Sequence, residues 1–544
     1  MAKLSLCVIA RNEERMLPDC LASVRGLVDE VVLVDTGSTD ATREIAIRHG
    51  ARVYDRPWDD DFAAPRNLAV RHATGDWVLQ LDADERLAPG SAAAVRRAMK
   101  SRDTDLFMLM LHDATRLDAP SGEVLSGAAR TGPPTPVPRL MRRTADLEYR
   151  GIVHESVEDW LVRHGYRLKM LDAHIVHLGA VLALRSARGK GERNVALLER
   201  RCREEPDSIT PFGYLAMEYW QSGRFEDARR AAEDGWRVLD AQPRHRSAQL
   251  LAVARALGFA RTGELASMLE TAVRVIGREG LQSDTGFLRA LALERMAGAE
   301  AGARRAELLA EAERGYRAVL TDRERPDERV LIEGSPSWLS RVRLGTTLLA
   351  RGSPAEAVGA FRAALAEVPG NEEARLGLAE ALLDGGDAAG ALALLGPKPG
   401  ERPDGWTLAA AAAEAAGNPA SARAFLSRAR ELAGKGFLAP HRPARLRALV
   451  RALGSRSEDS AELLAALLER RSPPGRLHGA ELDVGYLRRV VEDFLPRGQA
   501  DLLVPLLEPA AEAACPGLPA RMRALLAELG AEVVESPDPP AAAR

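Results

Sequence analysis

Apolar residues are spaced in two different ways along the first part of the chain. Short uninterrupted apolar runs, which are typical of buried strands, occur at residues 4–10, 30–35, 52–54, 77–81 and 106–111. Between these runs, apolar residues recur every three or four positions, as on one face of a helix, at residues 14–25, 40–49, 62–73 and 91–100. This alternation predicts an α/β domain whose mainly parallel, Rossmann-like sheet is covered by helices on both faces.

The alternation stops at residues 113–138, which are rich in proline, glycine, serine and alanine. Long loops of this kind inside compact domains are usually functional or mobile. Two interpretations are open for this segment: a disordered insertion, or a flexible wall over an active site.

Nearly all of the chain beyond residue 192 has helical spacing, and part of it repeats after 34 positions. The first copy contains Leu344, Gly345, Leu348, Gly352, Ala357 and Phe361, and the second contains Leu378, Ala379, Leu382, Gly386, Ala391 and Leu395. This period resembles the tetratricopeptide repeat, in which two antiparallel helices pack through small residues. We therefore predict an α/β domain at residues 1–190, an all-α solenoid at 200–530 and a disordered tail at 536–544.

Charge and composition narrow the classes of function. The 544 residues carry 75 Lys plus Arg and 78 Asp plus Glu, and the formal net charge of −3 excludes a strongly basic nucleic-acid binder. No run approaches the roughly 18 apolar residues of a membrane span. The first residues lack a secretory signal pattern, and the 4 cysteines are scattered, as in a reducing compartment. We expect a cytoplasmic protein with neither a membrane span nor a nucleic-acid partner.

Polar clusters stand at the ends of the predicted strands and between them. They are Arg11-Asn12-Glu13, the run from Asp35 to Asp40, the run from Trp58 to Asp61 followed by Arg66 and Asn67, and Asp82-Ala83-Asp84-Glu85. Open α/β sheets bind their ligands beyond the carboxyl ends of the parallel strands. The clusters are therefore expected to meet at one site.

Two of these clusters suggest how a nucleotide is held. Asp35 ends a strand, where it can accept a hydrogen bond from a base, and Gly37 and Ser38 let the turn pass close to a ligand. Asp82 and Asp84 project to the same side of an extended chain, so their carboxylates repel each other unless a cation lies between them. A hard divalent ion binds carboxylates together with phosphate oxygens and neutralises the charge on a departing diphosphate. The pair indicates group transfer from a nucleotide diphosphate.

Taken in order, the runs CVIARNEE, VDTGSTD, WDDDFAAPRN and GDWVLQLDADE resemble the inverting family-2 glycosyltransferases with a GT-A fold. Within that family, the chain is most similar to the subgroup whose catalytic domain is followed by tetratricopeptide repeats. This subgroup includes the bacteriocin S-glycosyltransferases of the sublancin type. The resemblance covers about residues 4–180 and the repeat region.

The resemblance implies roles for the motif residues. Those implied to bind the donor are Arg11, Asn12, Glu13, Asp35, Gly37, Ser38, Arg66, Asn67, Asp82 and Ala83. Among them, Asp35 would bind the uracil ring of a UDP-sugar, and Arg66 would lie near the sugar or the phosphates. The implied metal ligands are Asp82, Asp84 and His177, with Asp84 as the direct ligand, and the implied ion is Mn²⁺ or Mg²⁺.

An inverting transfer also needs a carboxylate that takes the proton of the acceptor. Glu155 is the candidate base, because it lies ten residues before Gly165-Tyr166 and this spacing resembles an acidic pair of the family. Asp159, in the pair Glu158-Asp159, is the competing candidate.

The expected function is metal-dependent transfer of a sugar from a UDP-sugar to a peptide or protein side chain, because the repeats suggest recognition of a polypeptide. The repeats can instead serve as a scaffold or form a homodimer. Two other functions are open: a glycosyltransferase that builds a cell-surface or lipopolysaccharide-like glycan, and a non-catalytic interaction protein. The sequence indicates neither the sugar nor the acceptor atom, whether S, O or N.

Overall fold

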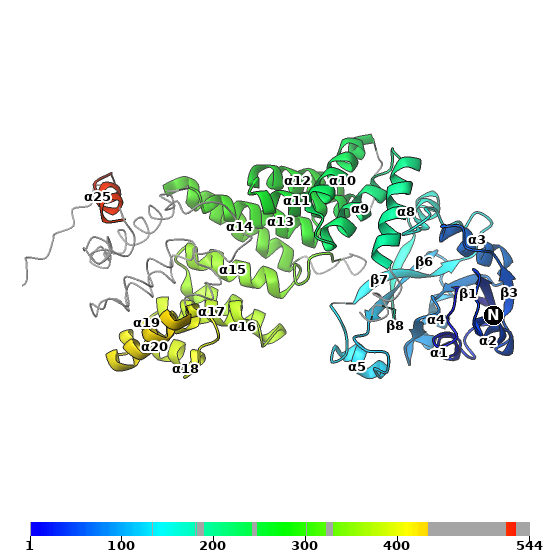
Figure 1. The fold of residues 1–544 in the computed structure, drawn as a ribbon, viewed down its shortest axis with the longest axis horizontal. Helices are drawn as coiled ribbons and strands as arrows, with labels where there is room; N and C mark the ends of the chain where they lie inside the picture. Colours follow the sequence, from blue (N-terminus) through cyan, green and yellow to red (C-terminus); the bar gives the residue numbers. More distant parts are fainter. Residues whose placement is uncertain are drawn as a thin grey trace, which may run out of the picture. The chain divides into compact units, whose positions relative to one another are not determined.

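The computed structural model describes residues 2–132, 134–179, 181, 190–241, 247–300, 302–321, 330–432 and 518–528 (Figure 1). Two compact units are present, and each is described by itself. The first contains residues 1–262, 274–285 and 322–333, and the second contains residues 263–273, 286–321 and 334–544. The predicted tail at 536–544 lies outside the described residues.

An eight-stranded sheet forms the N-terminal part of the first unit, in the order β3-β2-β1-β4-β7-β6-β8-β5. The strands are β1 (Leu4–Ala10), β2 (Glu30–Asp35), β3 (Arg52–Asp55), β4 (Trp77–Gln80), β5 (Glu85–Leu87), β6 (Leu106–Asp113), β7 (Thr135–Arg142) and β8 (Leu168–His177). The half β3-β2-β1-β4 is parallel, as predicted, because helices return the chain to the same edge between these strands. The other half is mixed: β7 runs antiparallel to β4 and β6, β6 runs parallel to β8, and β5 runs antiparallel to β8.

Helices cover both faces of the sheet, and the alternation of side chains along β1 shows which helix covers which face. Leu4, Leu6 and Val8 share one core with α1 (Leu17–Ser23), α2 (Thr42–Arg48) and α4 (Ser91–Ala98). Cys7 points to the other face, where the core includes residues of α3 (Ala63–His72) and α6 (Glu158–Arg163). The strands are therefore apolar on both faces, which explains their uninterrupted apolar runs.

The segment that was expected to be a loop has regular structure. It contains helix α5 (Ser121–Ser126) and the beginning of β7, where Pro136 and Pro138 pair with β6. Prolines are rare in central strands because they donate no hydrogen bond, and this is why the composition pointed away from a strand. The register between β6 and β7 shifts near Met108. The described part of the segment is thus partly regular, with turns and irregular chain on both sides of α5.

The remainder of the first unit is helical. Its helices include α8 (Lys190–Glu204), α9 (Ile209–Gln221), α10 (Phe225–Val238) and α11 (Ser247–Thr262). Leu197 and Leu198 of α8 and Leu215 of α9 share a core with Val153, which belongs to the sheet domain. Val153 and these helices therefore form a further hydrophobic core, separate from the two that cover the faces of the sheet.

The second unit contains the predicted repeats. These are the helix pairs α15 (Trp338–Ala350) with α16 (Pro354–Glu367), α17 (Glu372–Asp384) with α18 (Ala388–Leu395), and α19 (Pro403–Ala415) with α20 (Pro419–Leu432). A Cβ atom placed on Gly345 or Gly377 would lie 2.7 or 2.4 Å from the ring of Phe361. The small residues of the repeat thus allow the aromatic ring to pack between the helices. Within the described ranges, no helix has both the length and the apolar character needed to cross a membrane.

Candidate active site

A cavity of about 2240 Å³ brings most of the predicted site residues together. Those that line it are Arg11, Asn12, Glu13, Arg66, Asn67, Asp82, Ala83, Asp84, Glu155 and His177. The wall also includes Pro136 to Arg139 of β7, so the segment after β6 does border the cavity, as a strand. Residues of α8, α9 and α11 complete the lining. All of these residues belong to the first compact unit.

The turns after β1 and β2 are tied together beside the cavity. Asn12 has a φ of 56°. Its side-chain Oδ1 accepts a hydrogen bond from the main-chain amide of Thr39 at 2.8 Å, and its main-chain amide donates to Ser38 Oγ at 3.0 Å. Ser38 Oγ in turn donates to Asp35 at 2.5 Å, and Gly37 adopts a φ of 106°. Asp35 and Ser38 thus hold the shape of the turn, and neither they nor Gly37 lines the cavity.

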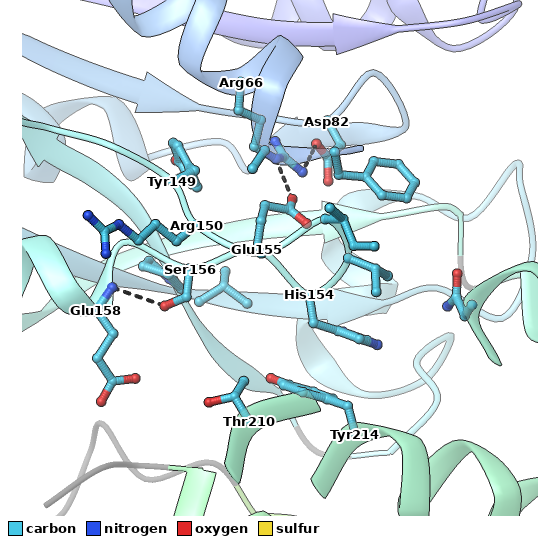
Figure 2. A pocket seen from close by; sticks show the side chains of 18 of the residues that line it. Arg66, Asp82, Tyr149, Arg150, His154, Glu155, Ser156, Glu158, Thr210 and Tyr214 are labelled. Carbon is cyan, nitrogen blue, oxygen red and sulfur yellow. Dashed lines mark hydrogen bonds and ion pairs between the residues drawn. The ribbon is translucent and has the colours of Figure 1, made fainter. Parts of the chain in front are cut away.

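Arg66 on α3 links the two most important carboxylates of the site. Asp61 accepts a hydrogen bond from the main-chain amide of Ala64 at 3.0 Å, where this helix begins. The Arg66 guanidinium lies 2.9 Å from Asp82 Oδ1 through Nη2 and 2.5 Å from Glu155 Oε1 through Nε. Figure 2 shows Arg66 between these two carboxylates. The residue that the motif placed near the donor therefore also holds the candidate base.

The charges around Asp82 keep it ionised. Burial alone would raise the pKa of Asp82, but Arg66 and Arg139 lower it to about 2. Arg139 of β7 lies 3.6 Å from Asp82 and 2.5 Å from the buried Glu85. Burial alone would lower the pKa of the Arg66 guanidinium. The negative charges of Asp82 and Glu155 have the larger effect and raise this pKa above its usual value. Two buried arginines thus surround Asp82, and Arg66 Nη1 and Arg139 Nε lack hydrogen-bond partners among the described residues.

Asp84 and His177 form a second pair in the lining of the cavity. His177 Nδ1 is 2.7 Å from Asp113 Oδ1, and His177 Nε2 lies 3.8 Å from Asp84 Oδ1. Burial would lower the pKa of His177, but Asp113 and Asp84 raise it. A carboxylate that holds one ring nitrogen and leaves the other toward a metal is a common second-sphere arrangement.

The backbone of Gly179 passes close to this pair. A Cβ atom at this position would lie 2.1 Å from Asp84 Oδ2 and 2.7 Å from His177 Nε2, so the chain can pass here only because residue 179 has no side chain. A carboxylate and an imidazole are both ligand types that divalent cations accept. Asp82 faces Arg66 and Arg139 instead, and the described residues contain no ready-made metal cluster of three or more His, Cys, Asp or Glu.

The two candidates for the base have different surroundings. The Glu155 side chain is 11% exposed and contacts Arg66. The Asp159 side chain lies on α6, is 53% exposed and lies 3.4 Å from the exposed Arg150. Both residues line the cavity, but Glu155 is the one that Arg66 holds.

Asn67 lines the cavity, and its side-chain amide is hydrogen-bonded to the main chain of Tyr149. Its Nδ2 donates to the carbonyl oxygen of Tyr149 at 2.9 Å, and its Oδ1 accepts from the Tyr149 amide at 2.7 Å. These bonds use the amide to fasten the chain that leads to Glu155. Asp113 and Gly179 are absent from the motifs recognised in the sequence. Asp113 ends strand β6, so the pattern of polar residues at strand ends includes it.

Two parts of the chain match known families. Residues 5–115 match the family described as Glycosyl transferase family 2, and residues 348–412 match the Tetratricopeptide repeat. The first match contains Asp82 and Asp84, and the second lies on helices α15 to α19.

Similar proteins come from the same two groups. A tetratricopeptide repeat-containing protein of Synechococcus elongatus is 33% identical over 241 residues, which are 43% of this chain and 57% of that protein. The SPbeta prophage-derived glycosyltransferase SunS of Bacillus subtilis is 23% identical over 205 residues, which are 37% of this chain and 45% of that protein. The solved glucosyl-3-phosphoglycerate synthase of Mycobacterium tuberculosis, in complex with Mn²⁺, UDP and phosphoglyceric acid, is 27% identical, with coverage of 20% of this chain and 43% of its own and a TM-score of 0.19.

The chain spans about half the length of the curated relatives just described. The match to SunS confirms the resemblance that the ordered motifs predicted. The chain therefore carries a glycosyltransferase domain of family 2 in its N-terminal part, followed by tetratricopeptide repeats.

Proposed function

We propose that this protein transfers a sugar from a UDP-sugar to a side chain of a polypeptide, with inversion at the anomeric carbon and with a divalent cation. The observation that carries the proposal is the contact of one buried arginine, Arg66, with both Asp82 and Glu155. Asp82 lies in the family-2 match, and Glu155 lies beyond it in the same cavity. A donor-side carboxylate and a candidate base thus share one site.

On the donor side, the residues of the chain supply positive charge and ligands. Arg66 and Arg139 each have a buried nitrogen without a hydrogen-bond partner among the described residues, and both line the cavity. Guanidinium groups suit the oxygens of a diphosphate. Asp84 and His177 would hold the cation, which when bound supplies positive charge that stabilises a departing diphosphate. Arg11 and Asn12 border the cavity where the nucleoside is expected.

On the acceptor side, Glu155 is the proton acceptor. Its carboxylate takes the proton of the attacking side chain as a bond forms to the anomeric carbon and the bond to the UDP oxygen breaks. The attack comes from the face opposite UDP, so the product has the inverted configuration. Arg66 fixes one oxygen of Glu155, which limits the positions that the carboxylate can take.

The lining of the cavity beyond Glu155 favours a polypeptide acceptor. Thr210, Ser247, Gln249 and Gln282 lie in this lining. The hydroxyls of Thr210 and Ser247 bond to each other, and Gln249 donates to Asp284. The Oε1 atom of Gln282 is buried and lacks a hydrogen-bond partner among the described residues. An unpaired acceptor of this kind gains from a ligand N–H, and the main chain of a peptide offers one at nearly every residue.

The proposal is tested by mass spectrometry of acceptors incubated with the full-length protein, Mn²⁺ and a panel of UDP-sugars. A pool of peptides that contain Cys, Ser, Thr and Asn is compared with a pool of oligosaccharides, and Glu155→Gln serves as the inactive control. We expect one sugar added to a peptide by the wild-type protein and none by the variant. Transfer to oligosaccharides alone would contradict the proposal that the acceptor is a polypeptide. If neither transfer nor UDP release is detected, the proposal that the protein turns over a UDP-sugar is wrong.

A further inference from the structure

Glu155 lies in a loop of residues 150–156. Its two ends are bonded to each other, and its middle is held by helix α8, which lies outside the sheet domain. Arg150 and Ser156 exchange two main-chain hydrogen bonds, of 2.9 and 3.0 Å, which close the loop. At the tip, Arg201 Nη1 of α8 donates to the carbonyl oxygen of Val153 at 2.7 Å and lies 3.4 Å from that of His154. The residue next to the candidate base is thus bound directly by α8.

Arg201 is built into this contact and is not a surface charge. It is 5% exposed, and its Nε donates to Glu205 at 2.8 Å. Gly151, with a φ of 92°, faces the guanidinium, and a Cβ at this position would lie 2.3–2.5 Å from three of its atoms. The loop backbone therefore packs flat against Arg201 in a way that only glycine permits.

His154 is held from a second side. Its φ of 50° is in the left-handed region, which is rare for residues other than glycine and persists only where the surroundings enforce it. Its ring stacks on Tyr214 of α9, with ring centroids 3.9 Å apart and planes 4° apart. Figure 2 shows Tyr214 and His154 on one side of the loop and Arg66 on the other, next to Glu155. The backbone direction at His154 sets where the Glu155 side chain can reach.

We propose that Arg201 and Tyr214 are positioning residues for Glu155. They hold residues 151–154 in the conformation that keeps the Glu155 carboxylate against Arg66. This inference rests on the proposed function, because it assigns to the first helices after the sheet domain a part in placing the base. The family-2 match ends at residue 115, so these helices add a contribution that the matched domain does not contain.

The expected effect is on the rate and not on donor affinity. A displacement of a reacting group by about 1 Å can cost on the order of 100-fold in rate. Arg201 and Tyr214 contact the loop and not Asp82 or Asp84, so binding of UDP-glucose is expected to remain. A purely structural role would instead lower stability without separating kcat from KM.

The test uses the full-length protein and measures UDP release from UDP-glucose with Mn²⁺. Arg201→Met removes the clamp, and Arg200→Met is the matched control, because Arg200 makes the same kind of i,i+4 ion pair with Glu204 on the exposed side of α8. Tyr214→Leu removes the stacked ring, and Tyr214→Phe retains it. Hydrogen exchange of the peptide that covers residues 150–157 is followed in the same samples.

We expect kcat to fall about 100-fold in Arg201→Met and Tyr214→Leu with an unchanged KM. Tyr214→Phe should retain most of the rate, and Arg200→Met all of it. Faster exchange at residues 150–157 should accompany only the two impaired variants. Wild-type rates together with unchanged exchange in Arg201→Met would overturn the inference. If the wild-type protein releases no UDP, the proposed function fails for this donor, while the exchange data still decide whether the clamp exists.

Discussion

At the scale of single residues, the site depends on how each charge is paired. Arg66 contacts Asp82 and Glu155, Arg139 contacts Glu85, and Asp113 contacts His177. The motifs predicted several of these residues but not their pairing, because the partners are far apart in the sequence. Glu155, for example, lies 89 positions from Arg66. Spacing in the sequence left Glu155 and Asp159 as alternatives, and burial next to Arg66 favours the first.

The choice of base leads to a prediction. Replacing Glu155 with Gln keeps the shape of the side chain but removes its ability to take a proton. UDP release should fall by about 100- to 10,000-fold, while calorimetric binding of UDP with Mn²⁺ should persist. Asp159→Asn is the matched control and should keep a rate close to that of the wild type. An active Glu155→Gln together with an inactive Asp159→Asn would show that the other carboxylate is the base.

His112 leads to a prediction about pH. Burial, together with the nearby His174 and Arg130, lowers its pKa to about 4 against the opposing effect of Asp113. An unfolded histidine titrates near pH 6.5, so between these values the unfolded chain binds a proton that the folded chain does not. The free energy of unfolding therefore falls as the pH drops from about 6.5 to 4, by on the order of 1–3 kcal/mol for this residue.

The measurement is the urea midpoint at pH 7.5 and pH 4.5. His112→Gln cannot titrate and should lose less stability over this interval than the wild type. Exposed His49 provides the control, and His49→Gln should follow the wild type. Equal losses in the wild type and in His112→Gln would show that this histidine does not contribute.

At the scale of elements, periodicity predicted the strands and helices well where one pattern dominated. Strands β1 and β2 were predicted at their observed bounds, since their residues are buried on both faces of a parallel sheet. Strand β7 was missed because Pro136 and Pro138 lie within it. Its place between β4 and β6 depends on pairing with strands distant in sequence, which local spacing does not report.

The repeats offer a prediction about packing. Gly345→Ala would place a methyl group 2.7 Å from the Phe361 ring, so we expect a loss of about 1–3 kcal/mol in the free energy of unfolding. Gly359 lies on the same helix as Phe361, and a Cβ there has open space around it. Gly359→Ala is the control and should gain about 0.5–1 kcal/mol. The free energies of unfolding are measured by urea unfolding, followed by far-UV circular dichroism. An unchanged free energy of unfolding in Gly345→Ala would contradict the close packing of Gly345 against the Phe361 ring.

At the scale of the whole molecule, the sheet ends with β8 at His177, but the first compact unit also contains the helices that follow it. The sequence pattern places a domain boundary between residues 190 and 200, and this division stays a prediction. The first compact unit continues to Thr262, because Val153 shares a core with α8 and α9 and Arg201 binds the loop. Hydrophobic spacing reports where one kind of element ends, whereas compactness depends on which side chains meet in space.

The proposed function requires Asp84 to act in metal-dependent turnover of a UDP-sugar. The most direct test is UDP release from a panel of UDP-sugars with Mn²⁺, Mg²⁺ or EDTA, for the wild type, Asp84→Ala and the control Asp118→Ala, whose carboxylate is 82% exposed. We predict metal-dependent release from one donor by the wild type and the control, and no release by Asp84→Ala or with EDTA. Equal release by Asp84→Ala, or release that persists in EDTA, would contradict metal-dependent transfer through Asp84.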